Sequence, residues 1–424
     1  RAFWFMNRTM RDQRLRSQVA ALRIEQKELS IADAVAAVDA RGEKAASWRA
    51  FQLAFILMQL PAVVDPTHLR RSTDFARAEL LFFPTGGGKT EAYLLLASFI
   101  IILRRLQHGE DGGGTAVISR YTLRLLTAQQ FERTATLICA LDLMRRRGEI
   151  PGDEPITIGL WIGGGETSSP NKLRPARIML EKMLEEERPV NRFMLLACPW
   201  CGTSLVPGQR SEALEDYGIT CTTTDFKFNC TAEGCPFHDR IPVQVVDEVI
   251  YSAPPTVLLG TIDKFARLPW ESRSRGLLGL GSSKRPPDLV IQDELHLISG
   301  PLGTIAALYE AGIDVLLEHA GSRPKTIAAT ATIRGAEDQA KRLYGRKVCL
   351  FPASGPDAAD SYFMTEERPD DSDREGFPRQ YIGIMGQGHT PVTSTVRVMA
   401  GMLDGGGLVS EGDVRVRSGR IDKI

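Results

Sequence analysis

The chain has 424 residues, of which 43% are hydrophobic and 25% are charged, and its 52 lysines and arginines balance 52 aspartates and glutamates. That balance excludes a protein that is basic throughout, so any surface for nucleic acid must be local. The longest apolar run, 92–103, is shorter than a membrane span and predicts a buried helix. No secretory signal is visible and the first residue is not methionine, so we expect a cytoplasmic fragment of a longer protein, without membrane contact.

Residues 1–75 are expected to form an N-terminal helical segment. The stretch 10–29 has the apolar spacing of a helix and many charges, and 48–60 predicts a second, more apolar helix. Four arginines of the first helix lie close together, and they suit either a solvated helix face or a contact with nucleic acid. These arginines are Arg8, Arg11, Arg14 and Arg16.

A glycine-rich turn, PTGGGKT, follows the apolar strand 79–83 and precedes an apolar helix. Glycines let backbone N–H groups face a phosphate without side-chain clashes, and the helix N-terminus adds a positive dipole end. We therefore predict an ATP site, with Lys89 on the β- and γ-phosphates and the Thr90 hydroxyl on Mg²⁺. Phe83 departs from the pattern, which asks for glycine there. The expected nucleotide-binding residues of the turn are Thr85, Gly86, Gly87, Gly88, Lys89 and Thr90.

From Glu79 onward strands and helices alternate, which predicts an α/β fold with a parallel sheet covered by helices on both faces. Expected strands are 79–83, 115–119, 155–161, 256–260, 288–292 and 326–329. Expected helices are 90–105, 122–146, 174–187, 262–268, 302–318 and 335–344. We assign 76–345 to this ATPase domain. Residues 346–424 are rich in proline, aspartate and glycine, and we expect a linker or the edge of an incomplete second domain.

Residues 190–250 interrupt this alternation and hold most of the cysteines. Without a signal peptide, clustered cysteines indicate metal binding rather than disulfides. Two pairs separated by 28 residues predict a zinc-ribbon-like insertion, in which the metal folds a segment poor in apolar residues. Cys221 and His238 are spare candidates. The four expected zinc ligands are Cys198, Cys201, Cys230 and Cys235.

A second acidic motif, DELH, follows the apolar strand 288–292. In an open parallel sheet, ligands bind beyond the carboxyl ends of the strands, so this motif and the glycine turn can share one site. Asp293 is then placed to hold the Mg²⁺ that Thr90 touches, and Glu294 to orient or deprotonate the attacking water. Phosphoryl transfer needs mainly such positioning and charge neutralisation.

PTGGGKT and DELH together resemble motifs I and II of the superfamily 2 DExH helicases, whose motor domains are RecA-like. The family tolerates residues other than glycine at the place of Phe83. The resemblance implies a catalytic role for His296 and a coupling role for Thr330 and Thr332 in the motif III stretch TIAATAT. It also makes Gln52 a candidate for reading adenine, the alternative being a polar residue in a core helix.

Three further stretches stand where this family contacts the nucleic-acid backbone: VISRYTLRLLTAQQ, WIGGG and GTIDKF. Contacts to the backbone suit binding that is largely independent of sequence. The residues that the resemblance nominates for this role are Arg120, Thr122, Gly164, Thr261 and Lys264.

More narrowly, the motifs resemble the helicase subunit of the DISARM anti-phage defence system, which carries a cysteine-bearing insertion at this place. That resemblance implies a bacterial protein, a DNA substrate and a partner subunit of the same system.

We therefore expect an ATP-dependent DNA translocase or helicase in anti-phage defence. The alternatives are a nucleic-acid-binding scaffold that uses ATP as a switch, and an RNA helicase. Arginine fingers of a second domain are not evident after 345, because Arg417 and Arg420 have the wrong spacing for that motif.

Overall fold

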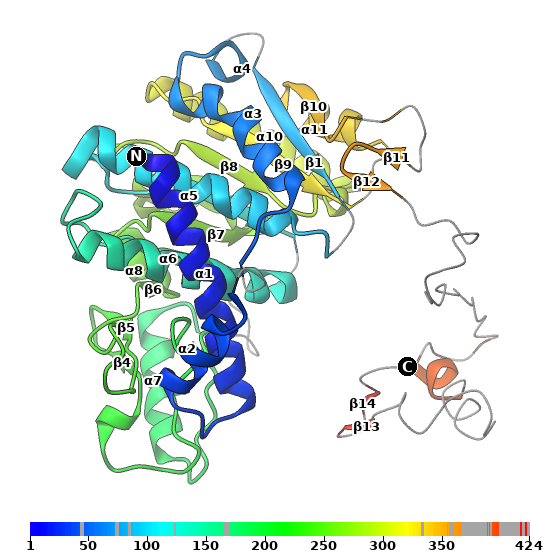
Figure 1. The fold of residues 1–424 in the computed structure, drawn as a ribbon. Coiled ribbons are helices and arrows are strands. Elements are labelled where there is room, and N and C mark those ends of the chain that lie inside the picture. Colours follow the sequence, from blue (N-terminus) through cyan, green and yellow to red (C-terminus); the bar gives the residue numbers. More distant parts are fainter. Residues whose placement is uncertain are drawn as a thin grey trace, which may run out of the picture. The chain divides into compact units, whose positions relative to one another are not determined.

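The computed structural model describes two compact units, Arg1–Thr365 and Glu366–Ile424. The described residues are 1–42, 46–72, 76–83, 86–122, 124–163, 170–331, 335–353, 355, 360–365, 388, 390, 392–397, 416–417 and 420–421. In the second unit residues 392–397 are helical, and a short antiparallel hairpin pairs β13 (Val416–Arg417) with β14 (Arg420–Ile421). The first unit holds the sheet and the sites described below (Figure 1).

An eight-stranded sheet in the order β10-β1-β9-β8-β2-β7-β3-β6 organises the first unit, and every pairing in it is parallel. Its strands are β1 (Arg77–Phe82), β2 (Val117–Tyr121), β3 (Ile158–Trp161), β6 (Val243–Gln244), β7 (Val257–Thr261), β8 (Leu289–Gln292), β9 (Lys325–Thr330) and β10 (Lys347–Phe351). Parallel strands need crossover connections, which here are mostly helical.

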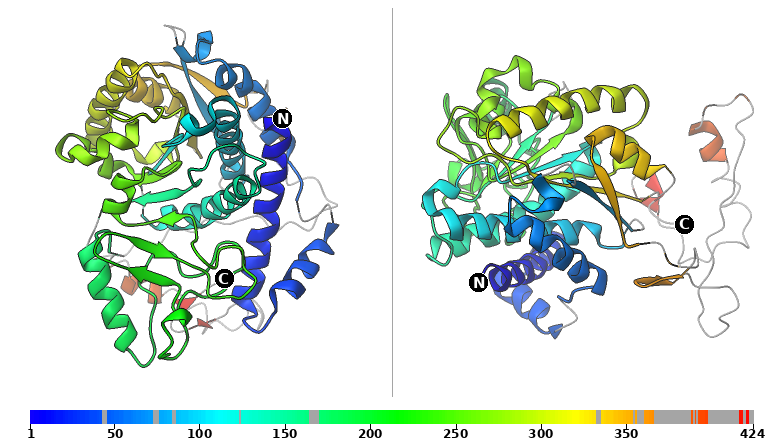
Figure 2. Two further views of the ribbon diagram at one scale, coloured as in Figure 1. Left: turned by 90° about the vertical axis from the view of Figure 1, so that its left-hand side faces the viewer. Right: turned by 90° about the horizontal axis from the view of Figure 1, so that it is seen from above.

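Helices cover both faces of this sheet (Figures 1 and 2). Successive strand residues point to opposite faces, so Leu289 and Ile291 pack with one set of helices while Val290 packs with the other. The first set is α1 (Ala2–Glu25), α3 (Ala50–Val64), α5 (Lys89–His108) and α6 (Arg124–Arg146). The second set is α9 (Ile262–Phe265), α10 (Gly300–His319) and α11 (Ala336–Tyr344).

Local signals in the sequence set several helix ends. The Ser30 hydroxyl accepts a hydrogen bond from the Asp33 N–H at 3.0 Å and so caps α2 (Ile31–Asp39). Gly345, in the left-handed conformation at φ 61°, ends α11. Two further helices of the described residues are short: α4 (Leu69–Ser72) and α8 (Asp247–Ser252).

Among the described helices, α10 has the length and the apolar composition that a membrane-crossing helix would need. In this fold it packs against the sheet through Ala306, Ile313 and Leu317, which are buried. It also carries the buried carboxylate of Glu310, which pairs with a cation of the sheet.

The insertion between α7 (Leu173–Glu185) and α8 contributes several large rings to the main core cluster. Phe193, Phe226 and Phe228 pack against one another with ring centroids 5.0 to 6.3 Å apart. The hairpin of β4 (Ile219–Cys221) and β5 (Phe226–Phe228) carries two of these rings. The segment buries more apolar area than its composition indicates, because its few rings are large, while the expectation that a metal folds it stays a prediction.

The predicted fold class is confirmed: a RecA-like parallel sheet with helices on both faces, a helical N-terminal segment and a cysteine-bearing insertion. Two strands of this eight-stranded sheet were not expected from the sequence. β6 has only two residues, and β10 lies beyond the boundary at 345 yet pairs with β1 along five residues. β10 is an edge strand that begins with the exposed Lys347, so its apolar signal is weak.

Helix α1 runs along α5 and α6 and reaches the insertion (Figure 2). There Arg23 Nη1 donates to the Cys201 carbonyl at 2.6 Å and to Thr203 Oγ1 at 2.7 Å. The Arg16 guanidinium lies 4.6 Å from the centroid of the Trp200 ring. Gly202 lets the two backbones approach, since a Cβ there would lie 2.6 Å from the Ala20 carbonyl oxygen.

We predict that Gly202→Ala lowers the free energy of unfolding by about 2 kcal/mol, because the added methyl meets α1 and because φ is +74°. Chemical denaturation followed by circular dichroism measures this. Gly208→Ala is the matched control in the same insertion, since its Cβ would have no atom within 4 Å. Equal stability of both variants would contradict the described docking of α1.

Candidate functional site

Three loops meet at the carboxyl edge of the sheet, because β1, β9 and β8 are neighbours. The glycine turn follows β1, the acidic pair follows β8, and Thr330 ends β9. Residues that are distant in sequence therefore come together at the place where open α/β sheets bind ligands.

The turn brings Lys89 and Thr90 to the start of α5. Gly88 precedes them at φ 94°, and a Cβ there would lie 2.8 Å from Gln52 Nε2, so this position requires glycine. Lys89 Nζ donates to the Phe83 carbonyl at 2.6 Å. Burial lowers the pKa of Lys89, opposed by the nearby carboxylates of Glu294 and Asp293. Thr85 lies outside the described residues.

Phe83, the departure from the glycine pattern, stacks on Phe51 of α3 with ring centroids 3.8 Å apart. This contact fixes α3 against the turn. Gln52, one residue further along α3, donates from Nε2 to the Gly88 carbonyl at 2.9 Å and accepts from the Arg49 N–H at 2.9 Å. The Nε2 end of the Gln52 amide thus holds the turn and the Oε1 end caps α3, while adenine reading by this residue stays a prediction.

The acidic pair follows β8. Asp293 is buried, which raises its carboxyl pKa, and its Oδ1 accepts from the Glu294 N–H at 2.9 Å. Glu294 has φ 49° and ψ 48°, and among the described residues it is the one non-glycine residue with positive φ. That conformation costs about 1–2 kcal/mol, and such strain clusters at functional sites. It turns the Glu294 side chain toward the cavity.

His296 lies between the acidic pair and the end of β9. Its Nδ1 is 3.4 Å from Glu294 Oε2 and 3.4 Å from Thr330 Oγ1. The imidazole therefore joins the DELH and TIAATAT stretches, as the family resemblance implies. Thr332 lies outside the described residues.

Two tyrosines and a glutamine at this site were missed by sequence reasoning. The Tyr93 hydroxyl lies 2.5 Å from Asp293 Oδ2, 3.1 Å from Thr90 Oγ1 and 3.2 Å from the Tyr121 hydroxyl. Gln130 Nε2 donates to Thr90 Oγ1 at 3.1 Å. Burial, with the charge of Asp293, raises the pKa of Tyr93, so both tyrosines stay neutral. Tyr121 and Gln130 lie within the stretch VISRYTLRLLTAQQ, but the resemblance nominates neither for this site, and no local signal marks Tyr93.

A cavity of about 820 Å³ opens over these groups. Helix α1 forms one wall, which sequence reasoning did not anticipate, and it contributes Arg11 and Arg14. The other two arginines of the predicted cluster have internal contacts: Arg8 pairs with Glu149, and Arg16 covers Trp200. The polar lining is Asn7, Arg11, Gln13, Arg14, Ser47, Arg49, Gln52, Lys89, Thr90, Glu91, Gln130, Arg133, Asp293 and Glu294.

Three residues nominated for nucleic-acid contact are buried. Arg120, 1% exposed, pairs with Glu310 of α10 and lies 5.6 Å from the centroid of the Phe265 ring. Lys264 Nζ pairs with Asp247 Oδ2 at 2.6 Å. Thr261, at the end of β7, is also buried. Their side chains do not reach solvent here, which argues against direct phosphate contacts, because carboxylates inside the fold already neutralise both cations.

Thr122 follows β2 at the same edge and is half-buried. Its Oγ1 is enclosed and has no hydrogen-bond partner among the described residues. Gly164 lies outside the described residues. Contact of these two with nucleic acid stays a prediction.

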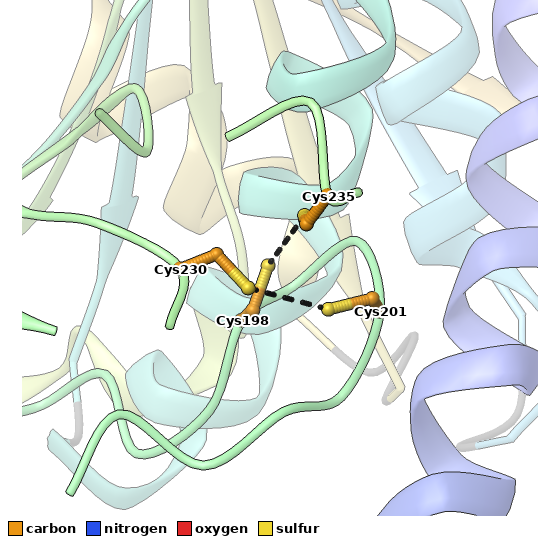
Figure 3. Close-up of side chains that lie close together, drawn as sticks. All are labelled: Cys198, Cys201, Cys230 and Cys235. Atoms are coloured by element: carbon orange, nitrogen blue, oxygen red, sulfur yellow. Dashed lines mark hydrogen bonds between the residues drawn. The ribbon is translucent and has the colours of Figure 1, made fainter. Parts of the chain in front are cut away.

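The four paired cysteines form one cluster, with their sulfurs turned toward one another (Figure 3). All Sγ atoms lie within 4.8 Å of each other, with 3.9 Å between Cys198 and Cys235 and 3.5 Å between Cys201 and Cys230. A tetrahedral ion with metal–sulfur bonds of about 2.3 Å needs sulfurs about 3.8 Å apart, so the cluster fits one. Hydrogen bonds among the thiols lower the pKa of Cys201 and raise the pKa of Cys198.

The other cysteines lie outside this cluster. Cys221 Sγ is 3.6 Å from the Leu173 carbonyl, and Cys139 is a core residue. His238 does not join the four sulfurs within the described structure.

The fold and the glycine-turn and DELH motifs define a RecA-like domain of the helicase class. No protein-family model matches the chain. Over 403 residues it is 38% identical to the DISARM protein DrmA of Bacillus paralicheniformis (strain ATCC 9945a / NCIMB 11709 / CD-2), which confirms the resemblance to the helicase subunit of that system. The match covers 84% of this chain and 35% of the relative, so the chain spans about a third of that protein's length.

Solved structures give weaker likenesses. The DUF1998 helicase MrfA bound to DNA is 13% identical with a TM-score of 0.38, over 71% of this chain and 25% of MrfA. The helicase Lhr of Mycobacterium smegmatis, bound to ssDNA and AMP-PNP, is 17% identical with a TM-score of 0.37, over 72% of this chain and 28% of Lhr.

We predict that Glu310→Ala lowers the free energy of unfolding by roughly 3–5 kcal/mol, because it leaves the buried Arg120 charge without its partner. The double variant Arg120→Met/Glu310→Leu removes both charges and should recover most of this loss. Chemical denaturation of the two variants tests the pair. A double variant as unstable as the single one would contradict the buried ion pair.

Proposed function

We propose that this chain carries the ATP-hydrolysing motor domain of a DNA translocase or helicase that acts in bacterial anti-phage defence. The observation that carries the proposal is the convergence of Lys89, Thr90, Asp293 and Glu294 on one cavity, from the ends of two strands separated by β9. A buried lysine, a hydroxyl and two carboxylates are the set that nucleotide hydrolysis needs.

Each group has one role in the proposed mechanism. Lys89 exchanges its bond to the Phe83 carbonyl for the β- and γ-phosphates. Thr90 and Asp293 would hold Mg²⁺, which would neutralise phosphate charge. Glu294, turned into the cavity by its left-handed backbone, orients the attacking water. His296 relays the state of this carboxylate to Thr330.

The likeness to DrmA supports the role in defence and the helicase class. We propose four further properties together with this role: DNA as the substrate, translocation along DNA, a cytoplasmic site of action, and a partner subunit of the same system. They belong to the whole protein, of which this chain matches about a third. We expect the nucleic acid to lie across the carboxyl edge of β2 and β7, near Thr122, and to be held mainly by its backbone.

We also propose that the cysteine cluster holds a structural zinc ion. Four thiolates close the coordination sphere and leave no open position for catalysis. The ion would tie together the two loops 198–201 and 230–235, which are separated by 28 residues of the chain.

For the motor, we predict that Glu294→Gln binds ATP and DNA normally but loses DNA-stimulated hydrolysis, since the water loses its orienting carboxylate. Lys89→Ala should lose ATP binding, because the phosphates lose the lysine of the turn. Steady-state ATPase and nucleotide-binding assays on the longest natural form of the chain, with DNA and with RNA, measure both. Unchanged turnover of the Glu294 variant would contradict the motor assignment, little turnover in the unaltered protein would favour the ATP-switched scaffold, and stimulation by RNA alone would favour the RNA helicase.

For the metal, we predict about one zinc ion per chain and its loss in Cys198→Ser, since three thiolates bind zinc far more weakly than four. The Cys198 variant should also become sensitive to protease within 190–250. Cys221→Ser, a cysteine change in the same insertion, should keep the zinc. Metal analysis that finds no zinc in the unaltered protein would refute the site.

A further inference from the structure

A buried chain of hydroxyl groups lies beneath the nucleotide turn and joins its two proposed magnesium ligands. Tyr93, on the first turn of α5, places its hydroxyl between Thr90 Oγ1 at 3.1 Å and Asp293 Oδ2 at 2.5 Å. The Tyr121 hydroxyl at the end of β2 lies 3.2 Å from it. Both rings are buried, so these contacts are not exchanged with bulk water.

The direction of each hydrogen bond follows from counting protons. A carboxylate only accepts, and a tyrosine has a single hydroxyl proton, so Tyr93 donates to Asp293. The Tyr93 oxygen is then an acceptor, and the neighbouring Thr90 hydroxyl donates to it. Gln130 Nε2 occupies one lone pair of Thr90 Oγ1, which leaves the second lone pair for a cation in the cavity.

We propose that Tyr93 is a positioning residue for the metal: its hydroxyl fixes the Asp293 carboxylate and draws the Thr90 proton away from the cation. The inference rests on the proposed function, because it concerns the magnesium of the nucleotide site. Tyr93 touches neither nucleotide nor metal. It acts through the two ligands and sets the direction in which each presents its lone pair.

A structural role alone does not account for this arrangement. The ring is buried in the main core cluster, and phenylalanine would fill its place as well. The hydroxyl, however, is satisfied entirely by site residues. Partners that orient the ligands of a metal typically contribute 10- to 100-fold to its affinity.

The test is Tyr93→Phe in the longest natural form of the chain, with Mn²⁺ as the probe. Electron paramagnetic resonance counts free Mn²⁺ in a titration with ADP present. We expect Mn²⁺ affinity to fall about 10- to 100-fold, while ADP affinity in EDTA is unchanged because Lys89 and the turn are intact. Tyr309→Phe is the matched control: its hydroxyl donates to the Ile262 carbonyl at 2.9 Å, on the other side of the sheet.

Tyr121→Phe provides a second variant should Tyr93→Phe fail to fold. Removing this hydroxyl leaves both ligands in contact with Tyr93 but takes away a partner that restrains its hydroxyl, so we expect a smaller, measurable loss of Mn²⁺ affinity of about 2- to 10-fold. Unchanged Mn²⁺ affinity in Tyr93→Phe, or in Tyr121→Phe when it alone folds, overturns the inference. Failure of the unaltered protein to bind Mn²⁺ with ADP would instead overturn the proposed function.

Discussion

Strands β1 and β8 do not pair with each other; β9 lies between them and pairs in parallel with both. The glycine turn and the acidic pair therefore stand two strand spacings apart, on the same edge of the sheet. Thr330, at the end of β9, therefore lies between the glycine turn and the acidic pair, and its hydroxyl contacts His296. The buried pair of Lys325 and Glu79, at 2.8 Å, ties β9 to β1 and helps to hold the arrangement.

Buried charges of this kind recur at the junctions of the fold. Asp288, at the start of β8, pairs with Arg71 at 3.0 Å and with Arg104 at 2.9 Å, which joins two helical segments to the strand that carries Asp293. Arg120 and Glu310 join β2 to α10. Losing one partner of such a pair would leave an uncompensated charge inside the protein.

Helix α1 connects the two candidate sites. Its middle lines the nucleotide cavity with Arg11 and Arg14, and its C-terminal end holds the cysteine module through Arg23. The module is thus not an independent appendage. Its Cys198 and Cys201 pack into the same core cluster as α5 and α6, so the metal site and the nucleotide turn share one continuous hydrophobic core.

Local pattern in the sequence determined much of this protein: the alternation of strands and helices, the glycine turn with Lys89, the acidic pair after β8 and the two cysteine pairs. These signals are contained in short stretches, where periodicity, turn chemistry and spacing act directly on the backbone. Tertiary structure alone decided that Tyr93 bridges Thr90 and Asp293, that Arg120 is buried against Glu310, and that α1 walls the cavity. Tyr93 and Asp293 are 200 positions apart, and Arg120 and Glu310 lie on different elements. These side chains meet only because the elements that carry them pack against one another in the fold.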